Sequence, residues 1–164
     1  AGMPNVWCTG PGSIIGAAAL QGKNKLTILT DPELNAFGSW LEQLVAESSG
    51  KEGKGIIPVD IEPFVDNDVY GEDRLFVYLS LTDELNERVQ SLQNSGHPVI
   101  KLPLQDKAQV AAQFYLWEMA IAYACAILKV NAFDQPNVQD SKTRTKRKVE
   151  KNKKLIGKGK IKKA

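Results

Sequence analysis

A helix end rich in glutamine, glutamate, serine and glycine is the first place where this sequence could do chemistry. In QLVAESSGKEGKGIIPV, Gln43 and Glu47 are four residues apart and share one face of a predicted helix. Glu47 falls in the last turn, where the negative end of the helix dipole favours its protonated form, which suits a general base. Gly50 and the next two glycines let the backbone come close to a ligand. An exposed glutamate beside a glycine-rich turn explains the same spacing.

A second candidate lies in the segment NAFDQPNVQDSK. Pro136 suits the first turn of a helix that Asp134 or Gln135 would open, and Lys142 then falls about two turns in. A solvated lysine on a helix is the simpler interpretation of this pattern.

Short apolar runs alternate with amphipathic helices, which predicts an α/β fold, a three-layer sandwich with a mostly parallel sheet. We expect Asp31 and Thr82 to cap the helices that follow them. The expected strands are 25–29, 55–59, 75–81 and 98–102, and the expected helices are 14–20, 31–48, 82–95 and 107–130, with another after residue 136.

Charge is divided unevenly along the chain. From Lys142 onward lie 12 of the 21 Lys and Arg residues and one of the 19 acids, a net charge of +11, so the first 141 residues carry −9. We expect residues 1–150 to form the folded domain and residues 151–164 to form a disordered basic tail. Nucleic acid is an unlikely partner, because no aromatic residues alternate with these lysines and no binding motif is present.

The composition, 43% hydrophobic and 24% charged, is ordinary for one soluble domain. The two cysteines have no metal or redox spacing, and Cys125 lies in an apolar helix, so we expect a buried thiol and a cytoplasmic protein. The longest apolar run, 114–128, is too short and polar to span a bilayer, so we expect no membrane partner. Glu118, inside this run, is expected to pair with a polar group in the core.

Two segments of the chain resemble those of one enzyme family. FDQPNVQDSK resembles the FDQPGVE…K signature near the C-terminus of phosphoglucose isomerases, and QLVAESSGKEGKGIIPV is similar to their Q…ES.GK.GKGI.P segment. The stretches WLEQLVAESSGKEGKGIIPV, VYGEDRLFVYL and GHPVIKL are most similar to the transaldolase-fused branch. The resemblance runs from about Lys25 to Lys142.

The resemblance implies a C-terminal sugar-isomerase (SIS) domain, Rossmann-like, that interconverts glucose 6-phosphate and fructose 6-phosphate. Glu47 then matches the base that moves a proton between C2 and C1 through a cis-enediol, and Lys142 matches the lysine that assists ring opening. Gln43 matches a residue close to the substrate, and Gly50 and Lys51 of the same segment are further substrate-binding candidates. This mechanism needs no cofactor, metal or nucleotide.

The sequence departs from the family in its phosphate site and in its ring-opening residue. The Ser/Thr-rich phosphate loop and the Gly-Gly-Arg segment of the family have no counterpart in this sequence. The ring-opening histidine of bacterial members is replaced; Asp68 is the nearest position, and His97, at a helix-to-strand turn, is the other candidate. A structural role in the turn is the simpler interpretation of His97.

We therefore expect a chain that supplies the C-terminal catalytic half of a longer enzyme and is incomplete alone. The missing half would come from an N-terminal SIS or transaldolase portion, or from a second copy in a homodimer. The alternative is a non-catalytic SIS domain that binds a phosphosugar as a sensor or regulator. Glu47 and Lys142 disfavour this alternative, because a pure binder needs neither.

Overall fold

The structure, a computed structural model, describes residues 5–134 and 136–157, and the surroundings of side chains 10–134 and 141–152. The chain divides into two compact units, Ala1–Phe133 and Asp134–Ala164. The described part of the second unit forms the helix α5 (Pro136–Gly157). The elements of the first unit are α1 (Asn5–Leu20), β1 (Lys25–Thr30), a 3-10 turn (Pro32–Leu34), α2 (Asn35–Ser49), β2 (Ile57–Val59), a 3-10 turn (Asn67–Val69), β3 (Arg74–Ser80), α3 (Asn86–Asn94), β4 (Val99–Pro103) and α4 (Gln109–Leu128).

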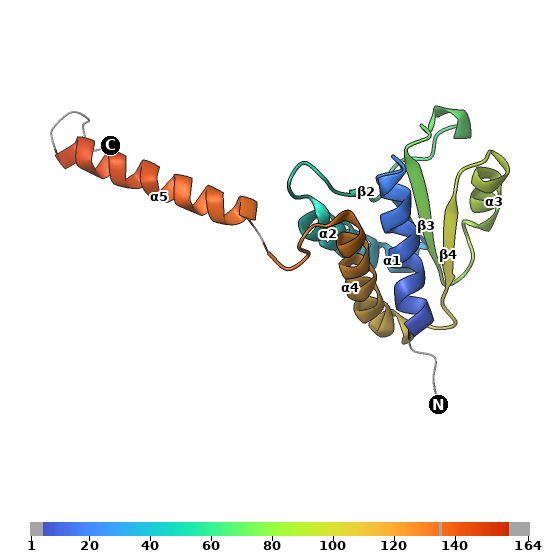
Figure 1. The fold of residues 1–164 in the computed structure, drawn as a ribbon. Helices are drawn as coiled ribbons and strands as arrows, with labels where there is room; N and C mark the ends of the chain where they lie inside the picture. The colour runs from blue at the N-terminus through green and yellow to red at the C-terminus, as the bar shows by residue number, and fades with distance from the viewer. Residues whose placement is uncertain (1–4, 135, 158–164) are drawn as a thin grey trace. The chain divides into compact units, whose positions relative to one another are not determined.

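Four parallel strands form the sheet in the order β2-β1-β3-β4 (Figure 1). Leu26 of β1 pairs with Pro58 of β2 on one side and with Leu75 of β3 on the other. Phe76 of β3 pairs with Val99 of β4. Parallel neighbours need crossover connections, and α2, α3 and the loop after β2 supply them. The direction of winding therefore reverses between β1 and β3.

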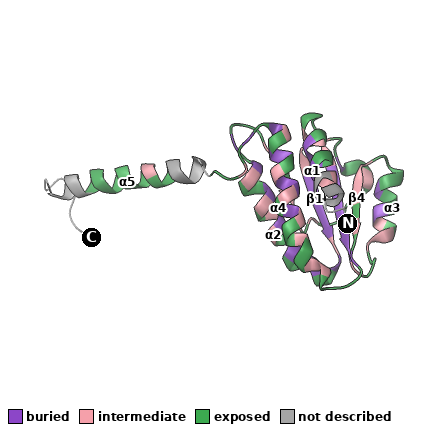
Figure 2. Cartoon of the chain, turned by 60° about the horizontal axis from the view of Figure 1, so that its bottom comes forward, coloured by how far each residue is buried: buried purple, intermediate pink, exposed green. Residues whose placement is uncertain are grey.

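Alternate strand residues face two separate cores. Ile28 and Val77 belong to the larger core, which lies under α1, α2 and α4. Leu29 and Tyr78 belong to the smaller core, under α3 and the loop that precedes β3. Figure 2 shows the buried residues along the strands and on the inner sides of the helices. The predicted α/β three-layer sandwich is confirmed.

Two glycines allow α1 and α4 to pack closely. A Cβ atom on Gly12 would lie 2.3 Å from the carbonyl oxygen of Ala120, and one on Gly16 would lie 3.0 Å from the side chain of Ile127. The sequence predicted a helix only from residue 14, because Pro11 and the glycines disfavour a helix in isolation. Packing against α4 overrides this weak local preference, and α1 begins at Asn5.

Within the described residues, α4 is the one helix long and apolar enough to cross a membrane by length and composition. Its inner side chains, among them Trp117 and Cys125, are buried in the larger core, whereas Phe114 and Tyr115 on its other face are exposed. The expected burial of Cys125 is confirmed. The expected core partner of Glu118 is wrong, since Glu118 lies on the outer side of α4 and is exposed.

The two expected helix caps differ in outcome: Asp31 holds the N-cap position before Pro32, whereas Thr82 does not cap α3. The backbone of Asp31 precedes the 3-10 turn, but its side chain makes no capping bond, and α3 begins four residues after Thr82. The Thr82 hydroxyl instead donates a hydrogen bond to Asp31 across the sheet edge, at 3.2 Å. A contact between residues so far apart in the chain is invisible to a local pattern.

The basic C-terminal segment is helical in the part that the structure describes. The helix predicted after Pro136 is confirmed, with this proline in its first position. The boundary expected at residues 150 and 151 is not observed, because α5 continues through Lys151 to Gly157, and the compact units divide between Phe133 and Asp134. Lysine is a good helix former, so the run need not end the helix. Residues 158–164 lie outside the described residues.

The glycines of α1 provide a test of the α1–α4 contact. We expect Gly12→Ala to lower the free energy of unfolding by about 1–3 kcal/mol, because the new methyl group meets the Ala120 carbonyl. Gly10→Ala is the matched control, since nothing lies within 4 Å of its Cβ position, and alanine there should stabilise the helix by up to about 1 kcal/mol. Urea denaturation measures both, and equal effects of the two variants would contradict the close packing.

Candidate functional site

Gln43 and Glu47 form a pair on the exposed face of α2. The side-chain nitrogen Nε2 of Gln43 donates a hydrogen bond to Oε1 of Glu47 at 2.9 Å, as the spacing of four residues predicts. The opposite face of α2, including Leu41 and Val45, is buried in the larger core. The core thus fixes the orientation of the helix and turns the amide and the carboxylate outward.

A buried serine connects the end of α2 to the strand that follows. Ser49 is fully buried, and its hydroxyl donates to the carbonyl of Val45 at 2.7 Å and accepts from the backbone N–H of Ile56 at 2.9 Å. The hydroxyl therefore brings the backbone at Ile56 close to the end of α2. The residues between them, Gly50 to Gly55, form a compact loop rather than an open one.

The loop is a tight hairpin whose conformation requires glycine. Lys51 and Lys54 exchange two backbone hydrogen bonds, at 3.2 and 2.9 Å, and the central residues Glu52 and Gly53 have φ of 56° and 72°. Two positive φ angles characterise a type I′ turn, in which glycine is favoured. At Gly55, φ is 145°, and a Cβ would lie 2.9 Å from the Cα of Gly50. The glycines expected to approach a ligand thus have a structural role as well.

Lys51 anchors this hairpin to the segment after α4. Its side chain is buried, and Nζ donates to the carbonyl of Asn131 at 2.5 Å. The amine thus points into the protein, and the expected contact between Lys51 and a substrate stays a prediction. Cys125 lies nearby: burial raises the pKa of its thiol, and the charge of Lys51 opposes this shift.

The two ring-opening candidates lie on the other side of the sheet from α2. The ring nitrogen Nε2 of His97 lies 3.0 Å from the carbonyl oxygen of Asn67, and the ring packs edge-on against Tyr70 and Phe76 of the smaller core. Asp68 follows Asn67 in the 3-10 turn and is exposed. The structure thus places His97 beside the turn that carries Asp68, but α2, with Glu47, covers the opposite face. His97 has the environment of a structural turn residue.

Lys142 belongs to the second unit. It lies in the second turn of α5, where the sequence predicted it, and its side chain is exposed. Ser141 and Arg144 beside it are also exposed. Gln135, one of the two residues expected to open this helix, lies outside the described residues.

Asp31 is a polar centre that the sequence analysis missed. It is fully buried at the carboxyl end of β1 and accepts hydrogen bonds from the Tyr78 hydroxyl at 2.5 Å and from the backbone N–H groups of Leu81, Thr82 and Asp83 at 2.7, 2.7 and 3.0 Å. Burial acts to raise the pKa of this carboxyl, but the hydrogen bonds outweigh it and lower the pKa.

The position of Asp31 bears on where a ligand could bind. Parallel sheets commonly bind ligands outside the carboxyl ends of the strands where the winding reverses, which is between β1 and β3 in this fold. At this edge the carboxylate of Asp31 accepts a hydrogen bond from the loop after β3. Beside it, an open cavity of about 440 Å³ lies at the carboxyl ends of β1 and β2, lined among others by Thr30, Asn35 and Asp60.

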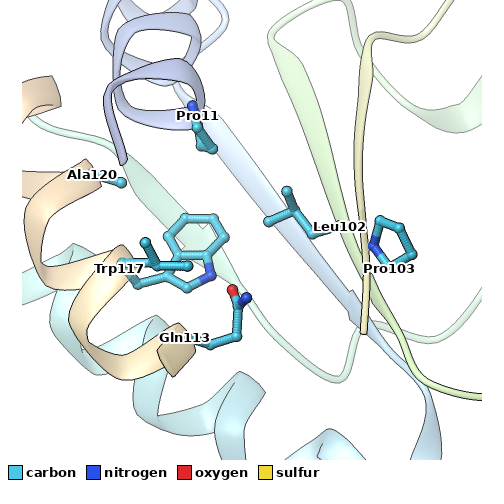
Figure 3. Close-up of a pocket in the computed structure, with 7 residues that line it drawn as sticks. Pro11, Leu102, Pro103, Gln113, Trp117 and Ala120 are labelled. Carbon is cyan, nitrogen blue, oxygen red and sulfur yellow. The ribbon is translucent and has the colours of Figure 1, made fainter. Parts of the chain in front are cut away.

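A small cavity lies between α1, β4 and α4, and Figure 3 shows the ring of Trp117 beside it, with Pro11, Leu102 and Gln113. Within the described residues, the indole nitrogen of Trp117 has no hydrogen-bond partner. The cavity volume is about 40 Å³, enough for a water molecule but not for a sugar phosphate. It is therefore not the substrate site.

A larger open cavity, of about 680 Å³, lies at the amino ends of the strands, beside the hairpin. Gly50, Gly53 and Gly55 line it together with Lys54 and Lys129. No group of three or more His, Cys, Asp or Glu side chains gathers to hold a metal ion in the described part of the chain.

Comparison with known proteins finds similarity to glucose-6-phosphate isomerases. Two glucose-6-phosphate isomerases of Streptococcus pyogenes, from serotype M18 (strain MGAS8232) and serotype M5 (strain Manfredo), are each 28% identical to the chain, over 66% of its length and 33% of theirs. The chain is similar to phosphosugar isomerases. It spans about a third of the length of these curated relatives. No family model matches it.

A likeness among solved structures supports the fold. A hypothetical protein from Thermus thermophilus superposes with a TM-score of 0.68, over 84% of this chain and 44% of that one, at 17% identity. At this identity the likeness concerns the α/β fold and not the function.

The hydrogen bonds of Asp31 predict a pH-dependent stability. A lowered pKa in the folded state means that the charged carboxylate stabilises the protein at neutral pH, and that this stabilisation is lost as the pH falls below the ordinary range of aspartate. We expect Asp31→Asn to cost about 1–3 kcal/mol at pH 7, because the N–H donors then face a neutral amide. The difference from wild type should shrink near pH 3. Urea unfolding at both pH values tests this, with exposed Asp66→Asn as the control; a constant difference would contradict it.

Proposed function

We propose that the chain supplies the catalytic C-terminal half of a glucose-6-phosphate isomerase, as an SIS domain of the transaldolase-fused branch. The observation that carries the proposal is the hydrogen-bonded pair of Gln43 and Glu47, held outward at the end of α2 and followed directly by the glycine hairpin. The 28% identity to glucose-6-phosphate isomerases over 66% of the chain supports it.

Glu47 is proposed as the base that moves the proton between C1 and C2. Gln43 donates to Oε1, and Oε2 accepts no hydrogen bond within the described residues, which leaves this oxygen to take the proton. The amide fixes the plane of the carboxylate, so that Oε2 is oriented before the substrate arrives. A positioned general base of this kind contributes about 10²- to 10⁴-fold in rate.

Lys142 is proposed to assist ring opening and to stabilise the enediolate through its positive charge. Its exposed side chain on α5 is available to a ligand. The partners proposed for the complete enzyme remain an N-terminal SIS or transaldolase portion or a second copy, and the proposed location is the cytoplasm. Proton transfer of this kind requires no cofactor.

The position of His97 favours the alternative, a phosphosugar-binding domain without catalysis. His97 is packed against the smaller core, and neither it nor Asp68 shares the face of the sheet that Glu47 occupies. Ring opening near Glu47 must then come from another group. A sensor would bind the phosphosugar and would not use Glu47.

Proton exchange separates these two functions without requiring ring opening. Fructose 6-phosphate has an open-chain fraction in solution, and abstraction of its C1 proton needs only the base. We expect the purified chain to exchange this proton with deuterated solvent, and Glu47→Gln to slow the exchange about 100-fold or more. The measurement is the loss of the C1 proton signal by NMR, with exposed Glu118→Gln as a matched control.

The outcomes are distinct. Exchange that is equally fast with Glu47→Gln would reject Glu47 as the base. Binding of fructose 6-phosphate without any exchange would favour the non-catalytic alternative. Formation of glucose 6-phosphate by the chain alone would show that it is complete.

A further inference from the structure

Three lysines converge on the C-terminal end of α4, in an otherwise acidic unit. Lys51 donates to the Asn131 carbonyl, Lys54 Nζ donates to the Leu128 carbonyl at 3.3 Å, and Lys129 is the residue that ends the helix. The first 141 residues contain 9 Lys and Arg against 18 acids, so a third of their cations lie at one place. In the described part of the chain, neither Lys54 nor Lys129 takes part in a salt bridge.

Lys129 occupies a position that would suit glycine better. Its φ and ψ are 56° and 47°, the left-handed conformation that commonly ends helices and that favours glycine. A side chain with a Cβ is disfavoured there. The lysine therefore adds a charge to this end of the helix at some cost in conformational energy.

The hairpin beside these lysines presents unused backbone donors. Within the described residues, the N–H groups of Glu52, Gly53 and Gly55 have no acceptor, whereas those of Lys51 and Lys54 bond within the hairpin. Gly53, Gly55, Lys54 and Lys129 line the same cavity of about 680 Å³. Leu20, Ile57 and Ile127 form part of its apolar wall.

We propose that this cavity binds the phosphate group of a phosphate monoester. Lys54 and Lys129 supply the positive charge, and the free N–H groups of Gly53 and Gly55 supply hydrogen bonds to the phosphate oxygens. The apolar wall contacts the carbon part of the ligand. The Glu52 carboxylate at the hairpin tip is the nearest negative charge on this loop, and it is exposed and does not line the cavity. The site does not depend on the proposed isomerase activity.

Amide NMR tests the site directly. At low salt, inorganic phosphate and fructose 6-phosphate are expected to shift the backbone signals of Gly53 and Gly55, which line the cavity, and uncharged fructose is not. Tighter binding of fructose 6-phosphate than of phosphate would identify a phosphosugar as the ligand, and equal binding would identify free phosphate. Unmoved amides, or equal shifts with chloride at the same ionic strength, would overturn the proposal.

Two lysine variants separate binding from folding. Lys129→Gly should weaken phosphate binding about threefold or more while leaving the melting temperature unchanged or higher, because glycine suits the left-handed position. The double variant Lys129→Gly with Lys54→Met should bind phosphate about tenfold more weakly than wild type. Lys107→Met, at the other end of α4, is the matched control and should bind phosphate as wild type does. Equal losses in the control, or unchanged binding in the double variant, would contradict the site.

Failure of this site and failure of the isomerase proposal give different results. Glu47→Gln should keep the phosphate-induced shifts, since Glu47 does not line the cavity. Absence of C1 exchange with the shifts retained would reject catalysis and keep the phosphate site. C1 exchange without the shifts would do the reverse.

Discussion

The hairpin after Glu47 depends on one costly interaction, the burial of a lysine amine. Removing an ammonium group from water is unfavourable unless strong acceptors replace the water. At the end of α4, the Asn131 carbonyl accepts a hydrogen bond from the Lys51 amine, and the negative end of the helix dipole also stabilises its charge. Hydrogen bonds consequently connect the hairpin, the end of α2 and the end of α4, and Ser49 joins them to Ile56, the residue before β2. The larger core orients the helix that carries Glu47, and these hydrogen bonds hold the hairpin that follows it.

The negative ends of the helix dipoles also explain why lysines cluster at the amino end of the sheet. Helices that return from the carboxyl edge of parallel strands end at the amino edge, so the negative ends of α2 and α4 meet there. Cations are stabilised in this field, and Lys51, Lys54 and Lys129 all occupy it. At the carboxyl edge, by contrast, the backbone donors of residues 81–83 are already used by Asp31. Free N–H donors remain available at the hairpin.

What the sequence predicted correctly depends on short-range geometry. The contact of Gln43 with Glu47 follows from helical spacing, and the strands and the burial of Cys125 follow from apolar patterns. What it missed depends on distant partners. Asp31 bonds residues about 50 positions away, and Lys51 bonds one 80 positions away, so no local pattern reveals that either side chain is buried. His97 was a candidate by residue type alone, and its aromatic neighbours come from β3 and the loop before it.

The exposure of Glu47 sets a condition on any catalysis. A carboxylate in water is strongly hydrated, and an enediolate formed in water lacks the oriented charges that would stabilise it. Gln43 and Glu47 are both exposed in the chain described, so the pair can orient a base but cannot exclude water from it. A surface that covers this face of α2 would strengthen each electrostatic contact with the substrate, because the local dielectric constant falls. The proposed partner portion must therefore approach from the side of α2, and it should add a rate increase to the exchange that Glu47 supports in the isolated chain.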